Sequence, residues 1–175
     1  RRDVYQRATG AASPAAAEHP FDSVLLCTTQ PRSDVCSQVR VTAHRELAAA
    51  VAALGGVDGR PLLVEGEIDF EAELSVVCTR DRTGRTLAFP VSRNTHDAGI
   101  LVESVAPAPI DPIIANDARE VADSIARGLD LVGVLTVELF QLRGGGLMIN
   151  ELAPRVHNSG HWSIEGAATS QFEQH

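Results

Sequence analysis

The 175-residue sequence contains no lysine, so all 15 of its basic residues are arginines. They are outnumbered by 23 acidic residues, which gives a formal net charge of −8 at pH 7. A protein that binds nucleic acid non-specifically needs a basic face to neutralise phosphates, so this balance argues against a nucleic-acid partner. Many phosphate sites use a lysine ammonium as a compact point charge. Any permanently charged side chain that binds phosphate here must therefore be an arginine.

Long apolar runs and paired cysteines are also lacking. No run approaches the roughly 18 residues of a membrane-spanning helix, which argues against a membrane protein. The three cysteines, Cys27, Cys36 and Cys78, form neither an even disulfide framework nor a CxxC metal motif. No apolar signal segment opens the chain, so we expect a cytoplasmic protein with reduced thiols.

The length and composition are those of one globular domain or of a piece of a larger protein. Hydrophobic residues make up 44% and charged residues 22%, and a chain of this length can bury roughly 70% of its unfolded surface. Residues 1–20 are rich in alanine and polar residues without a sustained period. We expect a poorly specified leading segment there.

The first half of the remaining chain predicts short strands and one helix. Runs rich in β-forming residues predict strands over residues 23–26, 39–41 and 61–65, with a polar loop between the first two. Thr42 has the chemistry of a helix N-cap, and apolar residues at helical spacing follow it until Gly55.

Two hairpins and a second helix are predicted further along. One hairpin spans residues 72–91 around a turn at 81–84, and the other spans 132–151 around glycines at 144–145. Between them, a helix should begin near Asp111 and end by Gly128. Hairpins interspersed with two helices predict an α+β fold, with mixed or antiparallel sheets and packed helices, and not the regular alternation of a doubly wound sheet.

The second hairpin brings oxygen ligands together at the ends of its strands. Glu138 lies near the end of one strand, and Asn150 and Glu151 lie near the end of its neighbour. Such a set suits Mg²⁺ bound with nucleotide phosphates, while the histidine or cysteine ligands that Zn²⁺ prefers are lacking. Strict alternation would put Glu151 on the opposite face from Asn150, so the site requires the strand to bend or end there. Two solvated strand-end acids are the alternative, and the spacing does not decide between them.

A polar loop rich in hydrogen-bond donors follows at residues 153–162. Arg155 can hold an anion through two parallel hydrogen bonds, and His157 can exchange a proton near neutral pH. Loops on a rigid sheet are where catalytic residues concentrate, although a purely structural loop is the alternative. The five acids of residues 65–75 repel one another unless some face a cation, a sugar hydroxyl or water. A solvated face is favoured there, because most acidic runs are solvated.

Several stretches, taken in order, resemble one family. They are EGEIDFEAELS at 65–75, residues 89–90 with NTHDAGIL at 94–101, VELF at 137–140, NELAPRVHNSGHW at 150–162, and SQFEQH at 170–175. These look like the ATP-grasp domain of 5-(carboxyamino)imidazole ribonucleotide synthase, a purine-biosynthesis enzyme. The resemblance is specific from about residue 61 to residue 175. The related formate-dependent formyltransferase and biotin carboxylase lack the RVHNSGHW and SQFEQH strings.

The resemblance implies an ATP-dependent carbon–nitrogen ligase. Such an enzyme carboxylates aminoimidazole ribonucleotide with bicarbonate and releases ADP and phosphate, with ATP and Mg²⁺ as cofactors. It also implies a homodimer for the full-length family, with flanking N- and C-terminal domains outside this chain. Residues 21–175 would then be a partial ATP-grasp domain, with a lid-like part at 21–65 and a metal and substrate part at 66–175.

Carried over position by position, the resemblance implies roles for particular side chains. The ATP-binding residues would be Glu65, Gly66, Glu67, Ile68, Glu73, His96, Asn150 and Glu151. The ligands of Mg²⁺ would be Glu138 and Glu151. The catalytic residues that orient bicarbonate and stabilise the developing anion would be Arg155, His157 and Asn158. The substrate-binding residues would be Asp34 and Gln38.

One stretch departs from the family at its phosphate-binding elements. The family's strand lysine is replaced by Cys27, and its glycine-rich loop reads RSDVCSQ at residues 32–38, which keeps only Asp34 and Gln38. Residues with a β-carbon obstruct positive-φ turns and close backbone approach to phosphate. We therefore expect little or no synthase activity from this chain. The alternatives are a non-catalytic nucleotide-binding remnant, or another ATP-grasp ligase such as the formate-dependent formyltransferase.

Overall fold

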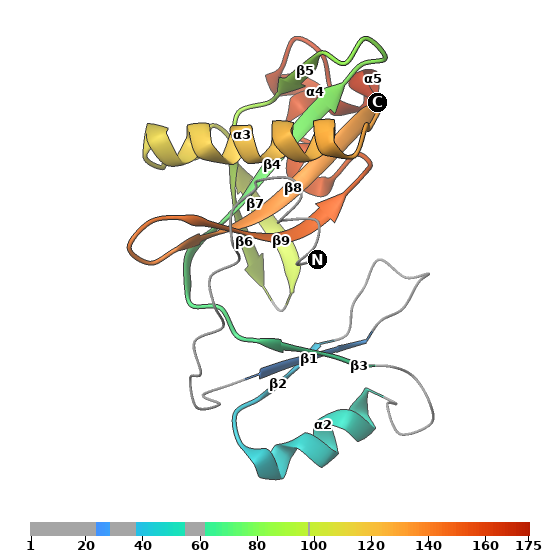
Figure 1. Ribbon diagram of the computed structural model, residues 1–175. Helices are drawn as coiled ribbons and strands as arrows, with labels where there is room; N and C mark the ends of the chain where they lie inside the picture. The colour runs from blue at the N-terminus through green and yellow to red at the C-terminus, as the bar shows by residue number, and fades with distance from the viewer. Residues whose placement is uncertain (1–23, 29–37, 55–61, 98) are drawn as a thin grey trace. The chain divides into compact units, whose positions relative to one another are not determined.

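A computed structural model describes residues 24–28, 38–54, 62–97 and 99–175 of the chain (Figure 1). The described residues fall into two compact units, which meet in sequence between Ile68 and Asp69. Each unit has its own sheet. The predicted leading segment, residues 1–20, lies outside the described residues.

The first unit contains a three-stranded antiparallel sheet. Strand β1 (Val24–Thr28) lies between β2 (Gln38–Val41) and β3 (Leu62–Gly66). The three strands predicted for this region are therefore confirmed to within two residues at each end.

The helix of this unit begins later than predicted. A short 3₁₀ turn, η1 (His44–Glu46), leads into α2 (Leu47–Ala53). Thr42 is not the N-cap of α2, because Glu46 occupies that position. The backbone N–H and the hydroxyl of Thr42 both donate to the Glu46 carboxylate, at 2.9 and 3.0 Å. These hydrogen bonds, led by the one from the Thr42 backbone, lower the pKa of Glu46. Glu46 thus accepts hydrogen bonds from the residues before the helix, Thr42 and Ala43.

The second unit is built on a six-stranded antiparallel sheet. Its central strand, β4 (Phe70–Arg80), pairs along one edge with β8 (Gly133–Leu142), which pairs in turn with β9 (Leu147–Ala153). Along its other edge, β4 pairs with β5 (Thr86–Ala88) near one end and β6 (Ser92–Asp97) near the other.

The last strand, β7 (Ile100–Val105), pairs with β6 at the border of the sheet. Both predicted hairpins are confirmed, as β4–β5 and β8–β9, and the strand pairings of the described residues are all antiparallel. The patterns did not predict β6 or β7. The sequence of β6, SRNTHD, buries Ser92 and Asn94, so it has none of the apolar alternation that identifies a strand.

Helix α3 (Pro112–Gly128) covers one face of this sheet and forms the core with it (Figure 1). Asp111 caps it by accepting a hydrogen bond from the backbone of Ile113 at 2.8 Å. Both the predicted span and the predicted inward face are confirmed, because Ala118, Ala122 and Ile125 are fully buried. The strand side chains that meet them are apolar, namely Leu74, Val76, Leu135, Val137 and Leu139.

Three short helical segments follow β9. They are η3 (Asn158–Gly160), α4 (Ser163–Gly166) and α5 (Gln171–Gln174). The first of them contacts β4, β6 and β7. Among the described residues, no helix combines the length and apolar character needed to cross a membrane.

Candidate active site

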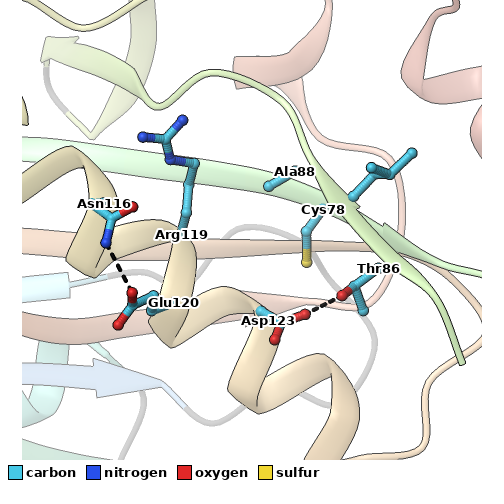
Figure 2. Close-up of a pocket in the computed structure, with 8 residues that line it drawn as sticks. Cys78, Thr86, Ala88, Asn116, Arg119, Glu120 and Asp123 are labelled. Carbon is cyan, nitrogen blue, oxygen red and sulfur yellow. Dashed lines mark hydrogen bonds between the residues drawn. The ribbon is translucent and has the colours of Figure 1, made fainter.

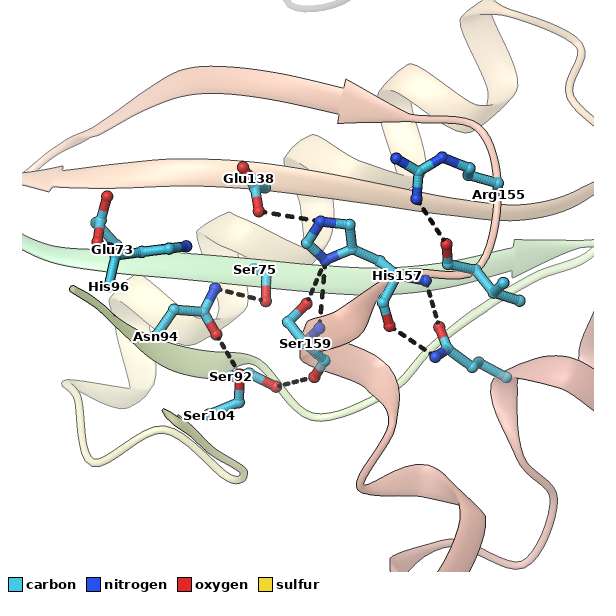
Figure 3. Close-up of polar contacts among 12 residues, drawn as sticks. Glu73, Ser75, Ser92, Asn94, His96, Ser104, Glu138, Arg155, His157 and Ser159 are labelled. Carbon is cyan, nitrogen blue, oxygen red and sulfur yellow. Dashed lines mark hydrogen bonds and ion pairs between the residues drawn. The ribbon is translucent and has the colours of Figure 1, made fainter. Parts of the chain in front are cut away.

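The sheet face opposite α3 carries a row of polar side chains (Figure 3). Directly paired residues of antiparallel strands project to the same face. Glu73 of β4 pairs with Asn94 of β6, and the next inward position, Ser75, pairs with Glu138 of β8. The apolar face therefore builds the core, while the alternate residues of the same strands gather polar groups.

A β-bulge adds Glu151 to this face. Glu138 pairs with Glu151, but the next residue, Leu139, pairs with Ile149, so Asn150 is an extra residue on β9. Asn150 and Glu151 thus oppose Glu138 together. The site required a departure from strict alternation at residues 150–151, and the bulge is that departure.

Glu138 lies in an unfavourable electrostatic position. Its side chain is 17% exposed. Burial raises its pKa, and the negative charge of Glu151 raises the pKa further. A buried carboxylate facing another acid needs a positive partner or a hydrogen-bond donor.

His157 faces this carboxylate. Its Nε2 lies 3.3 Å from a carboxylate oxygen of Glu138, while its Nδ1 accepts a hydrogen bond from the backbone N–H of Ser159 at 3.3 Å. The ring proton is therefore assigned to Nε2, facing Glu138. Burial, followed by the charge of Arg155, lowers the pKa of His157. Nε2 and the carboxylate oxygen thus lie within ion-pair distance, while the burial that lowers the pKa of His157 disfavours the charged form of the ring.

A second histidine and carboxylate meet further along the same face. His96 Nδ1 lies 2.6 Å from Glu73 Oε2, and both side chains are 25% exposed. Beside them, the buried amide of Asn94 donates to the Ser75 hydroxyl at 3.1 Å and accepts from the Ser104 hydroxyl at 2.8 Å. Sequence reasoning gave no role to Ser75 or Ser104, because single serines carry no motif signal.

The other predicted catalytic residues lie in the loop after β9. Arg155 is exposed and donates to the Val156 carbonyl at 3.1 Å, and Asn158 is an exposed residue at the start of η3. The charge of Arg155 lowers the pKa of both Glu138 and His157, so it acts electrostatically on both. Among the described residues, no group of three or more His, Cys, Asp and Glu side chains is arranged to hold a metal ion.

Several predicted site residues belong to the first unit. Residues 65–68 lie at the end of β3 and just after it, and Glu67 forms an ion pair with Arg40 at 2.5 Å. Gln38 is the first residue of β2. Asp34, with the rest of the 32–37 loop, and the side chain of Cys27 lie outside the described part of the chain.

An open cavity of about 340 Å³ lies on the other side of the sheet, between α3 and β5 (Figure 2). Cys78 lines it with Thr86, Arg119, Glu120 and Asp123. Thr86 donates to the Asp123 carboxylate, and Cys78 faces α3, with its sulfur 3.8 Å from the Ala122 carbonyl oxygen. This cavity is separated from Glu138 by the sheet, so it is not part of the polar site.

Comparison with known proteins places these features in one family. The ATP-grasp domain matches residues 23–172. The N5-carboxyaminoimidazole ribonucleotide synthase of Brucella melitensis is 45% identical over 138 residues, which cover 79% of this chain and 38% of that protein. The chain thus spans less than half the length of this curated relative.

Solved structures agree with the sequence comparison. The ADP complex of purK, an N5-carboxyaminoimidazole ribonucleotide synthetase, matches with a TM-score of 0.85 and 35% identity, over 99% of this chain and 48% of that one. A synthase from Aspergillus clavatus in complex with ADP and 5-aminoimidazole ribonucleotide matches with a TM-score of 0.75 and 31% identity. That match covers 87% of this chain and 38% of the other.

Proposed function

Because this chain belongs to the ATP-grasp family, we propose that it is part of a ligase that carboxylates aminoimidazole ribonucleotide. The reaction would consume ATP and bicarbonate and give 5-(carboxyamino)imidazole ribonucleotide, ADP and phosphate. One observation carries the proposal: Glu138 opposes Asn150 and Glu151 across a bulge, with His157 Nε2 3.3 Å from its carboxylate. The names of the related synthases support the same reaction.

Glu138 and Glu151 are the proposed ligands of Mg²⁺. Two carboxylates suit this ion, which commonly uses one or two protein oxygens and leaves its other positions to phosphates and water. Burial, and after it the charge of Glu151, raises the pKa of Glu138, so a bound cation would favour the ionised form of this carboxylate. When bound, Mg²⁺ would neutralise charge on the nucleotide phosphates.

Glu73 and His96 are the proposed nucleotide contacts of the second unit, with Asn150 beside the metal. His96 Nδ1 lies 2.6 Å from Glu73 Oε2. This contact orients the Glu73 carboxylate, which could then accept a hydrogen bond from a ribose hydroxyl. Residues 65–68 are the proposed hinge that contacts adenine. A solved relative bound to ADP supports a nucleotide site in this fold.

Arg155, His157 and Asn158 are the proposed bicarbonate residues. Arg155 provides a permanent positive charge at the polar site, and anions bind well to a guanidinium fork. Both ring nitrogens of His157 have partners, Ser159 and Glu138. His157 would thus hold its proton at Nε2, between the carboxylate and the anion, and stabilise charge that develops nearby.

The ribonucleotide is proposed as the second substrate, with Asp34 and Gln38 as its contacts. A relative bound to ADP and 5-aminoimidazole ribonucleotide supports this substrate class. The resemblance also leads us to propose a cytoplasmic homodimer for the full-length protein. A non-catalytic nucleotide-binding remnant is the second candidate, favoured by Cys27 and the missing glycines of residues 32–38.

Calorimetric titration with Mg·ADP tests the proposed site. Glu138→Gln and Glu151→Gln should each weaken binding about tenfold or more, which corresponds to about 1.4 kcal/mol, because each removes a charged oxygen ligand. Glu120→Gln on α3, across the sheet from the site, is the matched control and should bind like the parent. Unchanged affinity in both site variants would reject the metal assignment.

Turnover separates the two candidate functions. With aminoimidazole ribonucleotide, bicarbonate and Mg·ATP, release of ADP that depends on the ribonucleotide supports the ligase. Binding of ATP without release supports the remnant.

A further inference from the structure

The side chain of Gln171 forms hydrogen bonds with both the backbone N–H and the backbone carbonyl of His157. Its side-chain oxygen accepts from the His157 N–H at 2.9 Å, and its side-chain nitrogen donates to the His157 carbonyl at 2.7 Å. The glutamine is fully buried, with 0% of its surface exposed. A buried amide whose two ends bond to a single distant residue holds that residue in both position and orientation.

The backbone of Gln171 holds the other end of the same turn. Its N–H donates to the Ser163 hydroxyl at 2.9 Å, and that hydroxyl donates to the Gly160 carbonyl at 2.6 Å. Within the turn, the Gly160 N–H donates to the His157 carbonyl at 3.0 Å. Gln171 thus restrains both ends of the 157–160 turn. Its side chain bonds to His157, and its backbone N–H reaches Gly160 through the Ser163 hydroxyl.

Gly160 leaves the space that this arrangement needs. A β-carbon built there would lie 2.5 Å from the Gln171 side-chain oxygen and 2.8 Å from its amide carbon. Gly160 is not among the described glycines with positive φ, so its backbone conformation does not require glycine. The close approach of the Gln171 amide does.

The 157–160 turn sets the orientation of the His157 imidazole. Ser159, inside the turn, presents its N–H to Nδ1 at 3.3 Å, which leaves the ring proton on Nε2 toward Glu138 (Figure 3). Moving the backbone of residues 157–160 would separate Ser159 from the ring and release that orientation.

We propose that Gln171 is a positioning residue, which sets the orientation and tautomer of His157 against Glu138 through the 157–160 turn. The meaning of this for catalysis rests on the proposed function, but the positioning itself does not. The SQFEQH string, whose chemical role the sequence left unassigned, thereby gains one: it carries the amide that holds the loop of RVHNSGHW.

The test compares two glutamines on one short helix. Gln171→Met keeps the length of the side chain and removes both hydrogen bonds, while Gln174→Met makes the same change at an exposed position of α5. Imidazole ¹⁵N NMR at a pH where His157 is neutral reports its tautomer, with the signal identified by its loss in His157→Gln. Amide hydrogen exchange at His157 reports whether its backbone N–H is hydrogen-bonded to the Gln171 side chain.

We expect the parent and Gln174→Met to show the Nε2–H tautomer and a slowly exchanging His157 N–H. In Gln171→Met, the tautomers should mix and this N–H should exchange at least about tenfold faster, because its acceptor is gone. Far-UV circular dichroism checks that each variant is folded. An unchanged tautomer and unchanged exchange in folded Gln171→Met would overturn the proposal.

Gly160→Ala tests the same contact from the other side. Its methyl group should displace the Gln171 amide and give the same two changes, whereas Gly128→Ala, where nothing lies within 4 Å of the new β-carbon, should not. This variant decides the matter if Gln171→Met does not fold, and parent-like spectra in folded Gly160→Ala would overturn the proposal. None of these readouts requires nucleotide, so they stand apart from the Mg·ADP titration that tests the proposed function.

Discussion

Glu138 on β8 and Glu151 on β9 face one another because Asn150 is an extra residue in β9. In an unbroken ladder that continued the Leu139–Ile149 pairing, Asn150 would pair with Glu138, and Glu151 would move to Val137 on the core face. The bulge therefore keeps the second acid out of the core and beside the first. Burial, and after it the charge of Glu151, raises the pKa of Glu138.

Removal of the Glu138 charge should stabilise the metal-free fold. Because the pKa of Glu138 is raised above its ordinary value of 4.5, the stability that it contributes is present below pH 4.5 and is lost as pH rises through the folded-state pKa. Glutamine cannot ionise and is close to glutamic acid in size. Glu138→Gln should then unfold at a higher temperature than the parent near pH 8.

Thermal unfolding followed by circular dichroism, with a chelator present, measures this difference from pH 4 to pH 8. The gap between Glu138→Gln and the parent should shrink toward pH 4, where both side chains are neutral. The exposed variant Glu120→Gln should show no such gap. If Glu138→Gln is no more stable than the parent at pH 8, an ionised Glu138 does not destabilise the metal-free fold, and the prediction is wrong.

The thiol of Cys78 should be almost unreactive in the folded protein. Burial raises its pKa to about 12, and only 1% of the residue is exposed. At pH 8 about one thiol in ten thousand would be ionised, against about one in four for an ordinary cysteine. Peptide mapping after iodoacetamide treatment should show Cys78 modified roughly a thousandfold more slowly in native protein than in denaturant. Equal rates in the two states would show that the β4–α3 contact opens readily.

Residues 27–38 should limit turnover in any longer protein that contains them. We expect a chimera with the family's flanking domains to be poorly active, and Cys27→Lys together with a Gly-Tyr-Asp-Gly-Arg-Gly loop at residues 32–37 to restore activity. Each donor to a developing charge contributes roughly 2–4 kcal/mol, so several lost together lower the rate by many decades. The assay is ADP release that depends on the ribonucleotide. Equal turnover in the two chimeras would show that this loop does not disable the enzyme.

Local patterns in the sequence were sufficient for the elements that build the core. The α3 span and its inward face follow from the Asp111-Pro112 start and apolar residues at helical spacing, and both hairpins follow from β-rich runs around turn residues. These signals are local because capping, turn geometry and side-chain periodicity act over a few residues. The family strings likewise pointed to the ATP-grasp fold, which the comparisons confirm.

Strand β6 shows where such patterns fail. Its polar residues form buried partnerships with other strands, such as Asn94 with Ser75 and Ser104, so its burial has no apolar signature. The start of α2 was misplaced for a related reason. Thr42 has the chemistry of a cap, but α2 begins only after Glu46, whose carboxylate accepts from the Thr42 N–H and hydroxyl.

The sequence by itself determined which chemical groups this protein has: two strand-end acids, a loop with arginine and histidine, and no lysine. Only the tertiary structure decided how they meet. Three contacts join residues between 12 and 19 positions apart in the chain: the bulge at Asn150, the approach of His157 to Glu138, and the hydrogen bonds of Gln171 to His157. Such contacts depend on strand register and side-chain packing. These form only when the whole sheet assembles, and they produce no periodic pattern in the sequence.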